Sequence, residues 1–196
     1  MMEKTETVNL KELIIETANT IFSRFGFKKT TMNDIANAIH KAKSSIYYYF
    51  NSKEEIFKSI IEKESLQMKH ELNEAIEKET TPERKLRTYV ITRIKALNRL
   101  VNYYNALKDE YLERHEFIRK IREEHLKDEI NIIKKILTEG MRTGQFEIKN
   151  LDIAAMSIFL ALKGLEYPMI IEDKYNEIEK SIDSLLDILF NGINKR

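Results

Sequence analysis

The sequence predicts an all-α protein of about nine helices, in which an N-terminal head of three helices precedes a larger helical bundle. The 196 residues include only 5 glycines and 2 prolines, fewer turn residues than β-sandwiches, barrels or parallel sheets require. Hydrophobic residues make up 42% of the chain and recur at the i, i+3, i+4 spacing of amphipathic helices. Cysteine is absent, which excludes disulfide frameworks, cysteine-ligated zinc and thiol catalysis.

The three helices of the head are marked by their ends. The first is predicted over residues 10–25 and stops at Gly26, because glycine readily adopts the left-handed conformation of a helix cap. A second, short helix follows Thr31, which forms a capping-box pair with Asp34. A third helical stretch lies within residues 44–50. The head is therefore a long helix followed by two short ones.

The remainder of the chain predicts a long linking helix at residues 52–76 and a bundle of about five more helices. The bundle covers residues 81–104, 116–140, 151–165 and 176–193, with a short segment at 105–112. Ser52, Thr81 and Asn150 are expected to cap three of these helices at their N-termini. Pro168 is expected to end the helix that begins at residue 151. The chain is therefore predicted to divide into an N-terminal domain at residues 1–53 and a C-terminal domain at residues 54–196.

The charge of the chain is unevenly distributed. The net charge is +1 overall, but residues 20–53 hold six basic residues and one acidic residue, a net charge of +5. A basic segment on a slightly acidic body is typical of a nucleic-acid-binding module. A chance fluctuation of charge is the alternative at this point.

Two short helices joined by a turn of about three residues, after a supporting helix, describe a helix-turn-helix. The second of them is the expected recognition helix, with Ile46 and Phe50 facing inward. Lysine, serine and tyrosine side chains suit contacts with bases and phosphates. The candidate DNA contacts are Thr30, Thr31, Lys43, Ser44, Ser45, Tyr47, Tyr48, Tyr49 and Lys53.

The segment FGFKKTTMNDIANAIHKAKSSIYYYFNSKEEIF resembles the DNA-binding domain of the TetR family of bacterial transcriptional regulators. The resemblance covers about residues 10–60. It rests on Gly26, Thr30, Thr31, Ile35, Ala36, Ile46, Tyr47, Tyr49, Phe50, Lys53 and Glu54. Four positions depart from the family pattern: His40, Lys41, Ala42 and Ser44.

The resemblance implies a homodimeric, ligand-responsive regulator, most often a repressor, that binds a pseudo-palindromic DNA operator and is released by a small, largely apolar effector. It also implies a bacterial cytoplasmic protein, associated with the nucleoid when bound to DNA. By this resemblance, residues 1–53 are the DNA-binding domain and residues 54–196 are the ligand-binding and dimerisation domain. The last two helices are the expected dimer contact, and small residues in 151–165 allow close helix approach. A hairpin buried within a monomer is the alternative.

Aromatic residues in the body are candidates for lining an effector pocket. They are Tyr104, Tyr111, Phe117 and Phe159, and an ordinary core role is the alternative for each. The four histidines form no metal pattern, and neither a nucleotide-binding nor a zinc-protease motif is present. We therefore expect no cofactor, no metal and no enzymatic activity. No apolar run is long enough for a membrane span and no secretory signal is present.

Two other functions remain open from the sequence. One is a helical interaction module whose basic N-terminal patch binds an acidic protein partner. The other is a constitutive DNA-binding protein without an effector.

Overall fold

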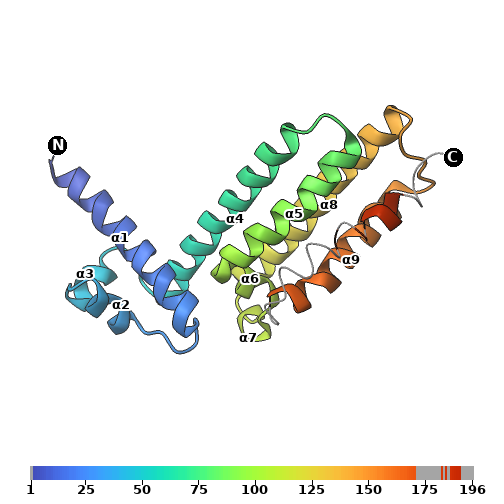
Figure 1. Ribbon diagram of the computed structural model, residues 1–196. Coiled ribbons are helices and arrows are strands. Elements are labelled where there is room, and N and C mark those ends of the chain that lie inside the picture. Colours follow the sequence, from blue (N-terminus) through green and yellow to red (C-terminus); the bar gives the residue numbers. More distant parts are fainter. Residues whose placement is uncertain (1, 171–181, 183, 185, 191–196) are drawn as a thin grey trace. The chain divides into compact units, whose positions relative to one another are not determined.

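The computed structural model describes residues 2–170, 182, 184 and 186–190, and it confirms an all-α fold (Figure 1). The helices are α1 (Met2–Phe25), α2 (Met32–Ala38), α3 (Lys43–Tyr47), α4 (Lys53–Glu77), α5 (Pro82–Arg99), α6 (Val101–Lys108), α7 (Glu110–Glu113), α8 (Glu116–Arg142) and α9 (Leu151–Ile170). Residues 182, 184 and 186–190 are also helical. In the part of the chain so described, no helix is both long and apolar enough to cross a membrane.

The chain divides into two compact units, Met1–Gln67 with Leu100–Arg119, and Met68–Arg99 with Lys120–Arg196. The first unit contains the three head helices, the first turns of α4, and α6 and α7. The predicted domain boundary after Lys53 remains a prediction about function. By compactness, the start of α4 belongs with the head, because its Phe57 is part of the head's core.

Aromatic packing forms the core of the first unit. The rings of Phe22, Phe27 and Phe57 lie 4.7–5.6 Å apart between centroids, and all three side chains are buried. Ring pairs at such separations contribute about 0.5–1.5 kcal/mol beyond the burial of their area. This cluster joins the end of α1, the loop after it and the first turns of α4.

The backbone signals predicted in the head are present. Gly26 has a φ of +80° and its N–H donates to the carbonyl of Phe22, so it caps α1 in the left-handed conformation. Thr31 and Asp34 form a complete capping box at the start of α2. His40 has a φ of +53° in the turn before α3. Ala42 is the N-cap of α3 and supplies no side-chain hydrogen bond.

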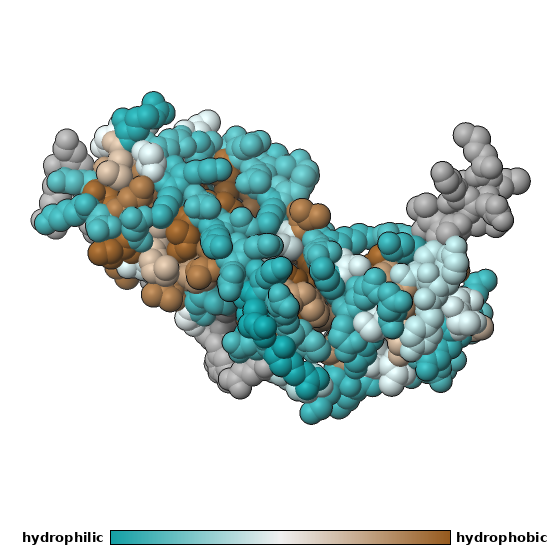
Figure 2. Space-filling view, turned by 180° about the vertical axis from the view of Figure 1, so that it is seen from behind, coloured by the Kyte–Doolittle hydropathy of each residue, from teal (hydrophilic) through white to brown (hydrophobic). Residues whose placement is uncertain are grey.

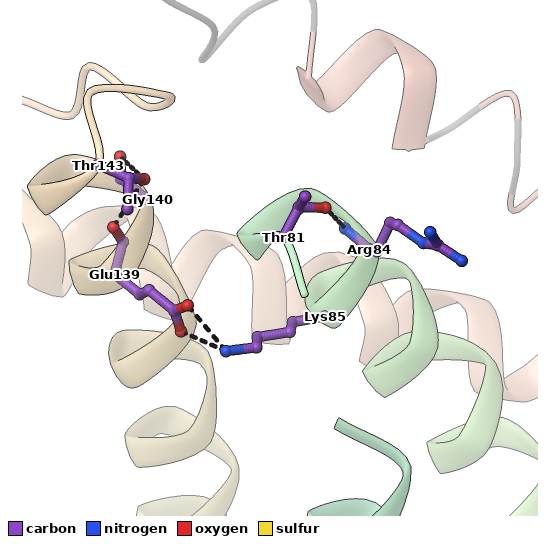
Figure 3. Close-up of polar contacts among 6 residues, drawn as sticks. All are labelled: Thr81, Arg84, Lys85, Glu139, Gly140 and Thr143. Carbon is purple, nitrogen blue, oxygen red and sulfur yellow. Dashed lines mark hydrogen bonds and ion pairs between the residues drawn. The ribbon is translucent and has the colours of Figure 1, made fainter. Parts of the chain in front are cut away.

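The second unit is a bundle built from the later turns of α4 with α5, α8 and α9. Lys85 bridges α5 and α8, because its ammonium lies 2.8 and 2.7 Å from the two carboxylate oxygens of Glu139 (Figure 3). The same view shows Thr81 capping α5, where its Oγ1 accepts from the N–H of Arg84. Asn150 caps α9 in the same way by accepting from the N–H of Ile153. Both caps were expected from the sequence.

Phe146 packs directly against α8 at Gly140. A Cβ atom built on Gly140 would lie 2.0 Å from the Phe146 ring. The backbone N–H groups of Gln145 and Phe146 both donate to the Gly140 carbonyl. Glycine is therefore required at this position by the close approach of the ring, although it is a poor helix former.

Three predicted helix boundaries were wrong. α1 begins at Met2 rather than near residue 10, because its polar first turns carry no apolar signal. The helix predicted to run to Tyr104 breaks at Leu100, whose φ and ψ of −86° and 66° are not helical. α9 continues past Pro168 to Ile170, because a proline in the last turn removes only one helix hydrogen bond.

Ser52 caps α4 as predicted, but the reciprocal hydrogen bond of a capping box is not formed. Ser52 Oγ accepts from the N–H of Glu55, but the Glu55 carboxylate accepts from Asn51 instead of Ser52. The last predicted helix, at 176–193, lies largely outside the described residues.

Candidate DNA interface and ligand cavity

The recognition helix α3 is anchored by two buried side chains. Ile46 and Phe50 are buried and one turn apart, so they fix the inner face of α3 against the head. α3 packs on α2, and α2 packs on α1. The opposite face of α3 is left to solvent, as the periodicity predicted.

Most of the predicted DNA contacts are at least partly accessible to solvent. Thr31, Lys43, Ser44, Tyr47 and Tyr48 are exposed, whereas Ser45 and Tyr49 are half-buried. The Tyr48 side chain is 78% exposed, which is unusual for a large aromatic residue. Its ring lies edge-on to Tyr49, with centroids 4.9 Å apart. The Lys43 ammonium lies 5.6 Å from the Tyr47 ring centroid.

Two predicted contacts, Thr30 and Lys53, are engaged inside the head instead. The hydroxyl of Thr30 is buried and donates to the Gly26 carbonyl at 2.9 Å. The Lys53 ammonium donates to the carbonyls of Phe27 and Thr30 at 2.8 and 2.9 Å. Lys53 therefore ties the start of α4 to the loop that leads into α2. The sequence pattern did not distinguish this structural lysine from a phosphate contact, because a lysine just after the recognition helix suits either role.

The loop after α1 also contacts α7 and the turn between α7 and α8, within the first unit. The Phe27 ring lies edge-on to His115, with centroids 5.6 Å apart. The Lys28 ammonium lies 5.0 Å from the Tyr111 ring centroid. Burial and the charge of Arg114 lower the pKa of His115, which favours its neutral form. Tyr111 therefore contacts two cations, Lys28 and Arg114.

An apolar cavity of about 270 Å³ lies in the second unit. It is lined by Val90, Leu137, Ile148, Ala154, Ser157, Ile158, Ala161, Leu162, Leu186 and Leu189. Only Ser157 brings a polar side chain to this lining. A cavity of about 150 Å³ lined by aliphatic residues stays dry and holds a benzene ring, so this one has room for a larger apolar group.

The four predicted pocket aromatics are not brought together at this cavity, whose described lining is aliphatic. Tyr104, Tyr111 and Phe117 belong to the first unit, and Phe159 belongs to the second. Tyr104 and Phe159 are buried, and Tyr111 and Phe117 are half-buried. Sequence reasoning missed the cavity because aliphatic residues at helical spacing look the same in a solid core.

A buried charged cluster crosses the core of the second unit between α5 and α8. The Arg93 guanidinium donates to the carboxylate of Glu129, and the Tyr89 hydroxyl donates to the same carboxylate at 2.8 Å. Burial alone would raise the pKa of Glu129, but Arg93 and His125 outweigh it and lower that pKa. Glu129 is therefore held ionised inside the bundle. The described residues contain no cluster suited to a metal ion.

α9 also carries an apolar face that the described part of its own chain does not cover. Ile153, Met156 and Leu160 are 64%, 40% and 59% exposed and recur on one side of the helix. Figure 2 shows hydrophobic residues gathered at the surface of the second unit, at the left of the view. Exposed apolar patches of this kind mark contacts with partners.

Comparison with known proteins places this geometry in a family. Residues 14–60 match the model of "Bacterial regulatory proteins, tetR family". The fatty acid metabolism regulator protein of Bacillus subtilis is 26% identical over 189 residues, which cover 93% of this chain and 95% of that protein. The negative transcriptional regulator IcaR of the biofilm operon icaADBC from Staphylococcus epidermidis is 40% identical over 53 residues, 27% of this chain and 29% of IcaR.

The similarity extends to solved structures over nearly the full chain. The structure of FadR from Bacillus subtilis in complex with stearoyl-CoA superposes with a TM-score of 0.72 at 25% identity, covering 93% of this chain and 99% of FadR. The matched residues 14–60 contain the helix-turn-helix described above, and the likeness continues through the helical body. The match of residues 14–60 and the similarity to these regulators together support a TetR-family transcriptional regulator.

Proposed function

We propose that the protein is a homodimeric repressor that binds a pseudo-palindromic DNA operator and is released by a small, largely apolar effector. The observation that carries this proposal is α3, a helix anchored by buried residues that presents exposed lysine and tyrosine side chains. The protein then acts in the bacterial cytoplasm, at the nucleoid when it is bound to DNA. Catalysis has no part in this proposal.

The proposed DNA contacts are those that the head leaves accessible. They are Thr31, Lys43, Ser44, Ser45, Tyr47, Tyr48 and Tyr49. Lys43 reaches phosphate or guanine, and the tyrosines supply hydroxyl groups to phosphates and ring faces to sugars or thymine methyls. Thr30 and Lys53 are assigned instead to holding the loop between α1 and α2, on the strength of their internal hydrogen bonds.

The proposed effector site is the aliphatic cavity of the second unit. Its lining suits an aliphatic chain, and only Ser157 offers a hydrogen bond. The related FadR was crystallised with stearoyl-CoA, which carries such a chain. We therefore take long-chain acyl compounds as the first effector class to test.

The salt dependence of DNA binding tests the interface. An operator is first selected from a random duplex pool, and its affinity is then measured as a function of salt. We expect Lys43→Ala to reduce the slope of log affinity against log salt by about 1.8, because each of the two heads of the dimer loses one phosphate contact worth about 0.9. Lys53→Met is expected to leave the slope unchanged and to lower the melting temperature, because its ammonium satisfies carbonyls within the head. Equal slopes for the wild type and Lys43→Ala contradict this interface.

Competition with an acyl probe tests the sensor. We expect stearoyl-CoA to weaken binding to the selected operator by about 5- to 150-fold, the usual range of allosteric coupling. Ala154→Phe fills part of the cavity and is expected to abolish this response while leaving operator affinity without the probe unchanged. Release that is equally strong in Ala154→Phe places the effector elsewhere. A protein that selects an operator but responds to no acyl or other apolar probe is a constitutive DNA-binding protein.

A chain that selects no duplex sequence and binds DNA no more tightly than other basic proteins refutes the repressor. The basic head then fits the alternative, an acidic protein partner.

A further inference from the structure

The start of α6, just after the break at Leu100, leaves backbone N–H groups in the first unit without partners in their own helix. Leu100 is the N-cap residue of α6 and has no side chain that can accept a hydrogen bond. The N–H groups of the first turn of a helix have no partner within that helix. A buried N–H that is left unsatisfied costs about 1–3 kcal/mol. This helix start therefore needs an acceptor from another element.

Glu64 on α4 supplies that acceptor. Its carboxylate accepts from the N–H of Tyr103, in the first turn of α6, at 2.6 Å. The Glu64 side chain is nearly inaccessible, since the residue is only 7% exposed. Burial raises the pKa of Glu64 to about 7, although the Tyr103 N–H and the Asn19 side chain both favour the carboxylate. Burial therefore disfavours the ionised form of this carboxyl group at the start of α6.

The same part of α6 also contacts α1, the supporting helix of the head. The side-chain amide of Asn102 on α6 donates to the backbone carbonyl of Asn19 at 2.9 Å and to its side-chain oxygen at 2.5 Å. The Asn19 side chain in turn hydrogen-bonds to Glu64. These hydrogen bonds connect α1, α4 and α6 through Glu64, Asn19, Asn102 and the N–H of Tyr103, a group that we call the polar junction.

We propose that Glu64 is a positioning residue for DNA binding, because it closes the polar junction that fixes α1 of the head against α6. Apolar packing is non-directional, whereas hydrogen bonds among buried groups select one arrangement of the elements that carry them. The polar junction therefore defines the orientation from which the recognition helix meets DNA. This inference rests on the proposed repressor function.

The geometry of operator binding separates a positioning role from a purely structural one. A dimer must place two heads on half-sites about 34–36 Å apart. A misplaced head weakens binding to the full operator, but one head still docks on a single half-site. Glu64→Leu removes the acceptor and replaces a buried carboxyl group with an apolar side chain of similar size. Glu64→Gln keeps the acceptor and the shape of the side chain.

The experiment measures affinity of the full-length protein for the selected operator and for a duplex with a single half-site, together with the melting temperature. We expect Glu64→Leu to weaken full-operator binding by about 5- to 150-fold, with half-site affinity close to wild type and a lower melting temperature, because the Tyr103 N–H loses its acceptor. Glu64→Gln should restore most of the operator affinity. Glu62→Leu is the matched control, because Glu62 lies on the same helix with its side chain 54% exposed.

Asn102→Ala serves as an independent variant, which deletes the donor to Asn19 and leaves Glu64 in place. It is measured by the same criteria and decides the matter if Glu64→Leu does not fold. Unchanged operator affinity in these variants, or an equal loss on the half-site, overturns the positioning role. A wild-type protein that does not prefer the full operator to the half-site overturns the dimeric repressor itself, which is a different outcome.

Discussion

Replacing Glu129 with alanine is expected to lower the free energy of unfolding by about 3–5 kcal/mol, the largest loss of stability that we expect from a single substitution in this chain. Arg93 is fully buried, and the Glu129 carboxylate neutralises its charge inside the second unit. Alanine removes that carboxylate and with it the acceptor for the Tyr89 hydroxyl. Urea denaturation followed by circular dichroism measures the change.

Two control variants separate the buried pair from ion pairs in general. Arg93→Met combined with Glu129→Leu removes both charges, and we expect it to be close to wild type or more stable. Glu139→Ala breaks the ion pair with Lys85, in which the side chains of Lys85 and Glu139 are 19% and 31% exposed. We expect it to lower the free energy of unfolding by about 1 kcal/mol or less. If Glu129→Ala costs no more than Glu139→Ala, then Arg93 is accommodated by groups other than this carboxylate.

The dependence of stability on pH follows from the same pair. The pKa of Glu129 is lower in the folded state than its ordinary value of 4.5. The unfolded chain therefore takes up a proton first as the pH falls, and stability decreases below about pH 4.5. The contribution is fully present at neutral pH. The double variant should lose this part of the acid sensitivity.

The sequence was most informative where local chemistry decides the structure. Gly26 and Thr31 mark helix ends through backbone conformation and capping, which need no distant partner. The helix-turn-helix was predictable because Ile46 and Phe50 are four residues apart, so a helix places both side chains on the same buried face. These features were the basis of the family resemblance, and they also predicted which side of α3 is exposed.

Distant contacts were not predictable from the sequence. Nothing near Leu100 signals a break, because the acceptor that satisfies the new helix start is Glu64 on α4. Lys53 looked like a phosphate contact, because its hydrogen bonds to the loop after α1 depend on the fold of the whole head. The cavity was equally hidden, because a lining of aliphatic residues has the sequence of a core.

Introducing a charge on the exposed apolar face of α9 is expected to abolish dimers. Leu160 is 59% exposed, and Ile153 and Met156 extend the same face. We propose this face as part of the two-fold contact that the sequence predicts for the last two helices, and Leu160→Glu then places a carboxylate in the interface twice, once from each subunit. At about 2 kcal/mol for each copy, a value typical of a central interface residue, the loss is about 4 kcal/mol, near a thousandfold in the dissociation constant.

Light scattering at tens of micromolar measures the outcome, with Leu66→Glu as the matched control. Leu66 lies on α4 in the first unit and is 67% exposed, so the two substitutions are alike in chemistry and exposure. We expect the wild type and Leu66→Glu to be dimers and Leu160→Glu to be a folded monomer, because an exposed position contributes little to the core of its own chain. The monomer should bind the selected operator no better than a single half-site, since one head reads too few bases for tight binding. A monomeric wild type, or a Leu160→Glu variant that remains dimeric, contradicts assembly through this face of α9.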